Sequence, residues 1–256
     1  VVIIIGECEE GSGSAALEKA LQENPSPDAI KAQLEKNFVI GAHKAFAITR
    51  LMKKAKFILV SALDKKIAKD LLFEAVDRTI ETRQKHRFGM PNPEGYRKAQ
   101  RLMKLAEKFN LPIISLFDTA GAFAGGAAEE RGQSQAVAAT IATGLSVKTP
   151  YVAVNVGEGG SGGAIAIGTG DKVFMLENAI YSVIAPESCA SILWKDNKYK
   201  AQAATALKLT ARDMASLNVI DKIISEPAGG AHKDWQTTME LLAKSVADAI
   251  KELQEI

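Results

Sequence analysis

The residues of this sequence with the clearest chemical potential are the glycines between Gly157 and Gly163, which fill five of seven positions. Glycine lets the backbone adopt positive φ and lets a ligand approach closely, while the first N–H groups of a helix lack intrahelical partners. Such a run between a strand and a helix can cradle a phosphate, form an oxyanion hole or serve as a tight turn. Glycine content alone leaves these three open, although a Walker-type loop is excluded because no Lys-Ser or Lys-Thr ends the run.

Charged side chains offer a second kind of chemistry, because Glu129, Glu130 and Arg131 are consecutive. In a catalytic interpretation, Arg131 orients an anion while a carboxylate handles a proton. We favour a structural interpretation, in which acids near the start of a helix stabilise it by about 0.3–1 kcal/mol. Glu158 and Glu187 are the only other glutamates near the expected loops that can form an acid-base pair.

Cysteines and histidines give no sign of a metal site. Cys8 and Cys189 are far apart and lack zinc-type spacing, which also argues against a disulfide framework. The three histidines are scattered along the chain. We therefore expect no metal in this chain, and we expect Cys189 to be a buried thiol, not a nucleophile.

The composition of the 256 residues narrows the class of protein. A net charge of +2 without a block of like charges, together with 6% aromatic residues, argues against nucleic-acid binding. The apolar runs are far shorter than the roughly 20 residues of a membrane span. The sequence starts in an apparent strand at Val1 without a signal-type leader, so we expect a cytoplasmic protein that does not bind membranes.

Short apolar runs alternate with segments of helical periodicity, which predicts an α/β fold. Strands are expected at Val1 to Ile5, Phe57 to Val60, Pro112 to Phe117, Tyr151 to Val156, Lys172 to Leu176 and Tyr181 to Ile184. Helices are expected at Ala15 to Gln22, Asp28 to Leu34, Ala42 to Lys54, Lys65 to Arg83, Gly95 to Phe109, Ala127 to Leu145, Ala164 to Gly168 and over most of Ala201 to Ile256, with an interruption near Ile220 to Gly230. Asn92, Pro93 and Glu94 supply a cap, a first-turn proline and a first-turn acid.

Several ordered motifs between residues 77 and 256 resemble the carboxyltransferase alpha subunit of acetyl-CoA carboxylase. They are Phe88 to Ala99, Asp118 to Phe123, Ala128 to Ser134, Gly157 to Gly163, Gly170 to Lys172, Met175 to Asn178, Tyr181 to Ile184, Ala190 to Lys195 and Gly229 to His232.

The resemblance implies a crotonase-like (ClpP/crotonase) α/β spiral of β-β-α units and a biotin-dependent carboxyltransferase. In this family the carboxyl group passes from carboxybiotin, held on a biotin carboxyl carrier protein, to acetyl-CoA, and malonyl-CoA is formed for fatty acid synthesis. A separate beta subunit holds acetyl-CoA. A homodimer or an α2β2 heterotetramer is implied.

The same resemblance nominates site residues by their place in the motifs. Backbone N–H groups of the Gly159-Gly160 and Gly162-Gly163 pairs are the candidates for an oxyanion hole that polarises the biotin ureido oxygen. Gly121 and Ala122 are candidates to line the same cavity. Arg131 and Glu158 complete the implied substrate-binding set.

Residues 1–76 resemble a different family, the C-terminal domain of lactate racemase-like proteins. The resemblance rests on Ile4 to Gly11, Phe38 to Ala45 and Phe57 to Ser61. We therefore predict a βαβ-like segment over residues 1–76 and a crotonase-type domain over 77–256. The junction lies in a helix-like stretch without a Pro/Gly/Ser linker, so the two parts can share one sheet.

Two alternatives to the carboxyltransferase subunit stay open. One is a natural or designed chimera that keeps the motifs as a non-catalytic scaffold. The other is a self-contained crotonase-type hydratase or hydrolase acting on acyl-CoA, with Glu158 and Glu187 as its acid-base pair.

Overall fold

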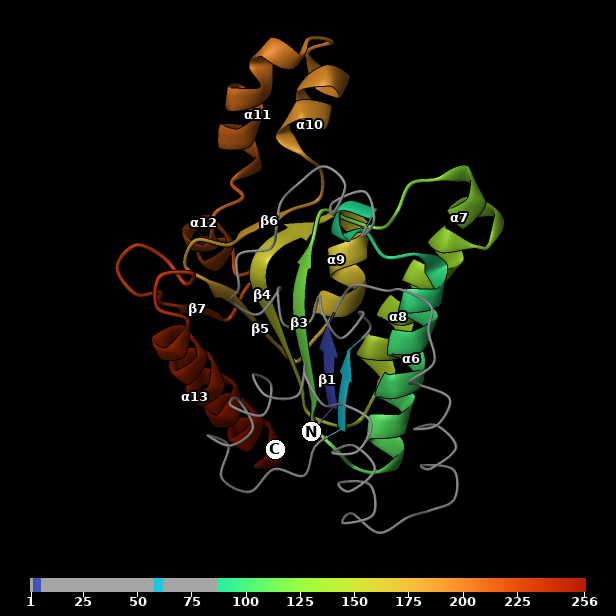
Figure 1. The fold of residues 1–256 in the computed structure, drawn as a ribbon, viewed down its shortest axis with the longest axis vertical. Coiled ribbons are helices and arrows are strands. Elements are labelled where there is room, and N and C mark those ends of the chain that lie inside the picture. Colours follow the sequence, from blue (N-terminus) through green and yellow to red (C-terminus); the bar gives the residue numbers. More distant parts are fainter. Residues whose placement is uncertain (1, 6–57, 62–86) are drawn as a thin grey trace.

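A parallel sheet forms the centre of the protein (Figure 1), in a computed structural model that describes residues 2–5, 58–61 and 87–256. The described strands form one seven-stranded sheet in the order β2-β1-β3-β4-β5-β7, and β6 pairs with the end of β4. The strands are β1 Val2–Ile5, β2 Ile58–Ser61, β3 Ile113–Thr119, β4 Tyr151–Gly160, β5 Lys172–Leu176, β6 Ile180–Ser182 and β7 Lys222–Ile224. Because every strand pair is parallel, the carboxyl ends of β3 and β4 lie at the same edge.

Helices cover both faces of this sheet. They are η1 Arg87–Gly89, α6 Pro93–Lys108, α7 Gly126–Glu130, α8 Gln133–Ser146, α9 Ser161–Gly168, α10 Pro186–Leu193, η2 Asn197–Tyr199, α11 Lys200–Leu207, α12 Ala211–Ser216 and α13 Trp235–Gln254. None of the helices in the described ranges is both long and apolar enough to span a bilayer. The four helices expected before residue 84 lie outside the described residues.

Alternation along β3 divides the buried side chains between two cores. Ile113 and Phe117 pack with α6, α8 and α9 on one face, whereas Ile114 and Leu116 pack with α12 and α13 on the other. This is the two-residue period of a strand buried on both sides. Figure 1 shows α6 and α8 on one side of the sheet and α13 on the other.

Buried polar side chains fasten secondary-structure elements to one another. Ser115 Oγ and Tyr151 Oη both donate to the carbonyl of Ile167, at 2.8 and 2.5 Å, and so tie the end of α9 to β3 and β4. On β4, Asn155 Nδ2 donates to the carbonyl of Ile180 at 2.8 Å, and Asn155 Oδ1 accepts from the N–H of Gly157 at 3.1 Å. These bonds hold the far half of β4 against β6.

Most of the predicted elements in the described ranges are confirmed. One further helix, α10, was not predicted, and three other differences follow. The expected loop from Gly157 is wrong, because β4 continues to Gly160 and α9 begins at the next residue. The single helix expected over Ala127 to Leu145 is two helices, since Gly132 takes a left-handed conformation with φ 80° between them. The interruption expected near Ile220 contains a strand, β7, that the sequence analysis did not predict.

The segment with α10, η2 and α11 projects from the sheet as an arm (Figure 1). Its small core contains Cys189, Ala190 and Ala203. Cys189 is a free, buried thiol, which confirms the packing role expected for it. The arm therefore has apolar contacts of its own.

The first part of the chain contributes two strands to the same sheet. β1 pairs with β2 on one side and with β3 on the other, both in parallel. This agrees with the expectation that the two parts of the chain share one sheet. The division at residue 76 stays a prediction.

We predict that Asn155→Leu destabilises the fold by about 1–3 kcal/mol, because the N–H of Gly157 and the carbonyl of Ile180 lose their partner. Urea unfolding monitored by circular dichroism measures this change. Asn197→Leu, at an exposed position of the arm, is the matched control and should leave stability within about 0.5 kcal/mol. Equal stability of the two variants would contradict the role given to Asn155.

Candidate oxyanion site

The junction between β4 and α9 carries the glycines that the sequence singled out. The strand runs through Gly160, and Ser161 opens the helix with a positive φ of 54°, a conformation that non-glycine residues seldom adopt. Within the described part of the chain, no side chain caps the start of α9. The first N–H groups of this helix therefore have no intrahelical or capping partner and form a local positive end.

Two of the glycines are required because another backbone lies directly against them. A Cβ on Gly160 would overlap the carbonyl of Ala120, and a Cβ on Gly163 would overlap the backbone N of Ala122. Gly162 is different, since its nearest atom is a valine side chain of α8 at 3.6 Å. The β3–α7 loop and the start of α9 are thus in direct contact, and both glycine positions make the contact possible.

Gly159 lies inside the sheet. Its residue position pairs with Thr119 of β3 and Tyr181 of β6. A Cβ there would lie 2.6 Å from Asn155 Nδ2 and 2.7 Å from the Tyr181 ring. The structure therefore gives Gly159 a packing role, on the opposite side of the strand from the loop that touches Gly160.

The loop after β3 is held in place by one threonine. Thr119 Oγ1 donates to the carbonyl of Gly89 at 2.7 Å and accepts from the N–H of Gly121 at 3.2 Å. Gly121 has φ +140°, which favours glycine, and a Cβ on it would meet Ser161 Cβ at 3.4 Å. The structure therefore brings the predicted Gly121 and Ala122 beside the start of α9.

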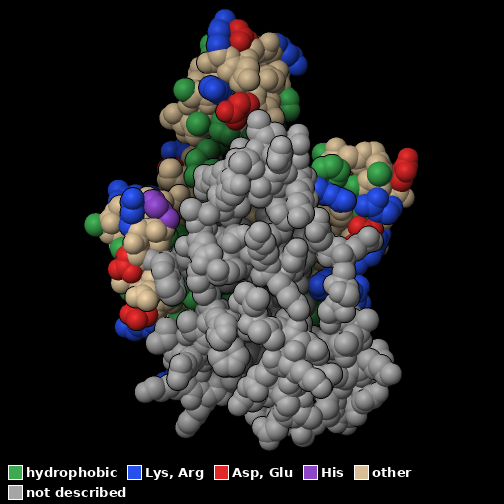
Figure 2. Space-filling view, viewed as in Figure 1, with side chains coloured by type: hydrophobic (Ala, Val, Ile, Leu, Met, Phe, Trp, Pro, Cys, Tyr) green, Lys and Arg blue, Asp and Glu red, His purple; other side chains and the backbone are tan. Residues whose placement is uncertain are grey.

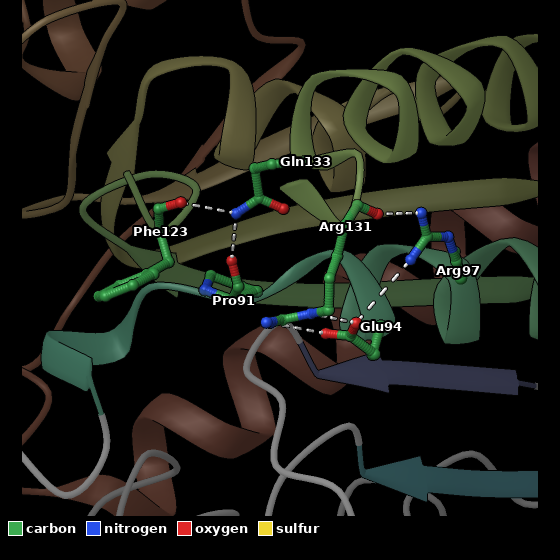
Figure 3. Close-up of polar contacts among 6 residues, drawn as sticks. All are labelled: Pro91, Glu94, Arg97, Phe123, Arg131 and Gln133. Carbon is green, nitrogen blue, oxygen red and sulfur yellow. Dashed lines mark hydrogen bonds and ion pairs between the residues drawn. The ribbon is translucent and has the colours of Figure 1, made fainter. Parts of the chain in front are cut away.

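A second set of bonds ties the same loop to the segment before α6 (Figure 3). Gln133 Nε2, at the start of α8, donates to the carbonyls of Pro91 and Phe123, both at 2.9 Å. The N–H of Phe123 donates to the carbonyl of Pro91 at 3.0 Å. Gln133 is 3% exposed, so these bonds are shielded from competing water.

Arg131 lies between α7 and α8 and pairs with a carboxylate of the protein itself. Its Nε is 2.8 Å from Glu94 Oε1, and its carbonyl accepts from Arg97 Nη2 at 2.5 Å (Figure 3). Burial acts to raise the pKa of Glu94, but the hydrogen bond from Arg131 and the charges of Arg131 and Arg97 outweigh it and lower that pKa. Because these side chains are about a third or more exposed, the ion pairs stabilise little.

The neighbouring acids Glu129 and Glu130 form no ion pair or catalytic pair that the structure records. Glu129 lies in the first turn of α7, as expected for an acid that stabilises a helix start. It also accepts a hydrogen bond from Ser134 Oγ at 3.2 Å. Across the described ranges, no three His, Cys, Asp or Glu side chains are grouped in a way that suits a metal ion.

The acidic neighbour of Glu158 is Asp118, and not the Glu187 considered from the sequence. The register of β3 on β4 shifts around Asp118, and the Asp118 carboxylate accepts from the N–H of Glu158 at 2.7 Å. Gly157 leaves room for this carboxylate, since a Cβ there would lie 2.6 Å from it. Burial, and then the charge of Asp118, raise the pKa of Glu158. Glu187 instead lies 4.0 Å from Lys200 on the arm.

The sequence analysis missed the polar groups beneath the loop. Tyr96 on α6 is fully buried, and its hydroxyl lies 2.6 Å from the position of a Cβ on Gly163. Asn92 begins α6 as expected, but its side chain makes no capping hydrogen bond. Both residues lie in the motif from Phe88 to Ala99, which could have drawn attention to them. From that motif, only the start of the helix was predicted.

Comparison with known proteins identifies the family. A family model described as acetyl co-enzyme A carboxylase carboxyltransferase-like matches residues 71–256. The alpha subunit of acetyl-coenzyme A carboxylase carboxyl transferase from Rhodospirillum centenum is 55% identical over 175 residues, which cover 68% of this chain and 55% of the relative. The Flavobacterium psychrophilum protein of the same name is 51% identical over 200 residues, covering 77% and 63%. The chain thus spans little more than half the length of these relatives.

Solved structures support the fold at lower sequence identity. Transcarboxylase 12S, in crystals with methylmalonyl-coenzyme A bound, superposes with a TM-score of 0.57 at 17% identity and covers 65% of this chain and 32% of its own. A Pseudomonas malonate decarboxylase hetero-tetramer in complex with coenzyme A gives 0.57 at 13% identity, with coverage of 64% and 68%. The predicted crotonase-like α/β fold is confirmed.

The family model matches well over half of the chain, and both relatives exceed 50% identity. The chain belongs to the acetyl-CoA carboxylase carboxyltransferase family.

Proposed function

We propose that this chain is the substrate-activating part of the alpha subunit of a biotin-dependent acetyl-CoA carboxyltransferase. In the overall reaction, the bond between the carboxyl carbon and a ureido nitrogen of biotin breaks, and a bond from that carbon to the acetyl methyl carbon forms. The proton of the methyl group ends on the ureido nitrogen, so the products are malonyl-CoA and biotin. The observation that carries the proposal is the contact between the start of α9 and the β3–α7 loop in a chain of this family.

Backbone donors are the groups to which we assign the chemistry. The N–H groups of Gly162 and Gly163 at the start of α9 and that of Ala122 in the loop are the proposed donors to a ureido oxygen that gains negative charge. Gly160 permits the close approach of the loop, and Gly159 maintains the packing of β4. Preorganised donors of this kind stabilise a transition state without a titrating side chain.

Two charged side chains keep a proposed role in binding. Arg131 pairs with Glu94, and its exposed position suits a contact with an anionic group of the substrate or its carrier. Glu158 is the exposed residue of β4, and its side chain is free of the core packing that fixes its neighbours, which supports a role in contacting the substrate. Both residues are assigned a role in binding, and neither is assigned a role in proton transfer.

Acyl-CoA is the proposed second substrate, and no metal is assigned to this chain. Structurally similar proteins have been solved with methylmalonyl-coenzyme A or coenzyme A bound. In the proposed reaction, carboxybiotin arrives on a biotin carboxyl carrier protein, and a carboxyltransferase beta subunit holds acetyl-CoA. A homodimer or an α2β2 heterotetramer in the cytoplasm is the proposed assembly.

The arm is the surface we assign to the beta subunit. The neighbouring residues Ile192 and Leu193 are 58% and 65% exposed there, and adjacent apolar side chains on a surface are typical of interaction sites. Figure 2 shows lysine or arginine and acidic side chains together on this arm at the top of the view. An apolar patch with a rim of mixed charge is the usual composition of a protein interface.

The first experiment mixes the full chain with a carboxyltransferase beta subunit, free biotin and malonyl-CoA. We expect acetyl-CoA and carbon dioxide to form only when both subunits and biotin are present, as followed by chromatography of the CoA esters. Turnover by this chain alone on crotonyl-CoA would favour a hydratase. Absence of turnover at saturating beta subunit would favour the non-catalytic scaffold.

In the same assay we predict that Gly163→Ala lowers kcat by about 10²- to 10³-fold, the effect of losing an oxyanion donor. The added Cβ must displace the Ala122 N–H that lies against it. Gly126→Ala is the matched control, because no atom lies within 4 Å of a Cβ at that position. Retained activity in Gly163→Ala, with a normal melting temperature, would exclude Ala122 from the site.

Charged residues introduced into the apolar part of the arm should weaken the complex with the beta subunit. We predict that the double substitution Ile192→Glu and Leu193→Glu weakens beta-subunit binding at least 10-fold, since charges at the core of an interface are strongly unfavourable. Leu145→Glu on α8, at a residue that is 73% exposed, is the control and should bind like the wild type. Isothermal calorimetry gives both affinities, and equal values would place the interface elsewhere.

A further inference from the structure

The Tyr96 hydroxyl forms no hydrogen bond with any residue that the structure describes. The residue is fully buried. A buried hydroxyl without a partner costs free energy, whereas phenylalanine would fill the same space without that cost. Unsatisfied buried groups are rare in folded proteins and call for a specific explanation.

The position of the hydroxyl supplies that explanation. Around the point where a Cβ of Gly163 would lie, the nearest atoms are the backbone N of Ala122, the carbonyl carbon of Gly121 at 2.5 Å and Tyr96 Oη at 2.6 Å. The hydroxyl therefore lies where the β3–α7 loop meets the first turn of α9, an eight-residue helix without a side-chain cap. The hydroxyl, the backbone N of Ala122 and the start of α9 therefore lie side by side.

We propose that Tyr96 is a ligand-binding residue of the oxyanion site, whose hydroxyl donates to the same substrate oxygen as the N–H groups of Ala122 and the start of α9. The ligand class is a carbonyl or enolate-like oxygen that gains negative charge. Its identity as the ureido oxygen rests on the proposed function. The Tyr96 oxygen is closed to solvent, so binding requires a local shift of the Gly121–Ala122 peptide, which the backbone freedom of Gly121 permits while Thr119 and Gln133 hold the residues on either side.

The protonation state of Tyr96 suits a donor. Burial raises the pKa of its hydroxyl far above the ordinary value, so the proton stays in place throughout the physiological range. A neutral donor does not bring a charge into the core, and its contribution does not vary with pH. Removal of the hydroxyl should therefore change the rate and leave the shape of the pH profile unaltered.

The test compares two Tyr→Phe variants in the complex with the beta subunit. Tyr96→Phe should lower kcat for biotin-dependent malonyl-CoA decarboxylation about 100-fold, while the melting temperature of the ligand-free complex stays the same or rises. Tyr151→Phe is the matched control, because Tyr151 is equally buried but its hydroxyl donates to the carbonyl of Ile167. That variant should melt at a lower temperature and keep the wild-type kcat.

Each other outcome overturns a specific statement. If Tyr96→Phe keeps the wild-type kcat, or loses activity only in proportion to a lower melting temperature, the hydroxyl is structural and this inference fails alone. If the wild-type complex does not decarboxylate malonyl-CoA, the proposed function fails and this inference fails with it. Tyr96→Leu, which also removes the ring, separates the two roles: it should lower the melting temperature, whereas Tyr96→Phe should not.

Discussion

The close approach of two backbones at Gly160 and Gly163 is the constraint on which the site depends. The carbonyl of Ala120 and the N of Ala122 occupy the space that side chains at those positions would need. Side chains there would push the β3–α7 loop away from α9 and separate the two sets of N–H donors. Glycine in this region is therefore a requirement of packing, and the proposed chemistry depends on it because the packing brings the proposed donors together.

The loop stays in this position because buried, neutral hydrogen bonds hold it. Thr119 connects it to Gly89, and Gln133 connects it to Pro91. Both side chains are almost completely buried, where a hydrogen bond is strengthened by the low dielectric and loss of a partner is costly. The more conspicuous ion pair between Arg131 and Glu94 is partly exposed and contributes less. Precision at the site thus comes from uncharged contacts made by the segment that precedes α6.

The alternation of strands and helices could be predicted from the sequence. Buried residues recur at every second position in a strand and at every third or fourth position in a helix, so each kind of element has its own pattern. The sequence predicted the neighbourhood of Gly121 and Gly163 through motif resemblance, and the structure brings these residues together.

Three features depended on tertiary contacts that periodicity does not encode. β4 extends through Gly160 because β6 pairs with its end, Gly132 breaks a helix by its left-handed φ, and Asp118 reaches Glu158 because the register of β3 shifts beside it. The role proposed for Tyr96 could not be predicted from the sequence either, since a tyrosine on an apolar helix face is usually a core residue.

The site combines donors that do not titrate with one carboxyl that does. Backbone N–H groups and the Tyr96 hydroxyl keep their protons across the working range, whereas burial and Asp118 raise the pKa of Glu158. A carboxyl whose pKa is raised on folding stabilises the protein below its unfolded pKa, and this contribution is lost as the pH rises through the folded value. Holding Glu158 beside Asp118 therefore costs stability at neutral pH. An acid pair and, among the described residues, an unpaired Tyr96 hydroxyl both cost stability near the β3–α7 loop, and these costs support the proposal that a substrate oxygen binds there.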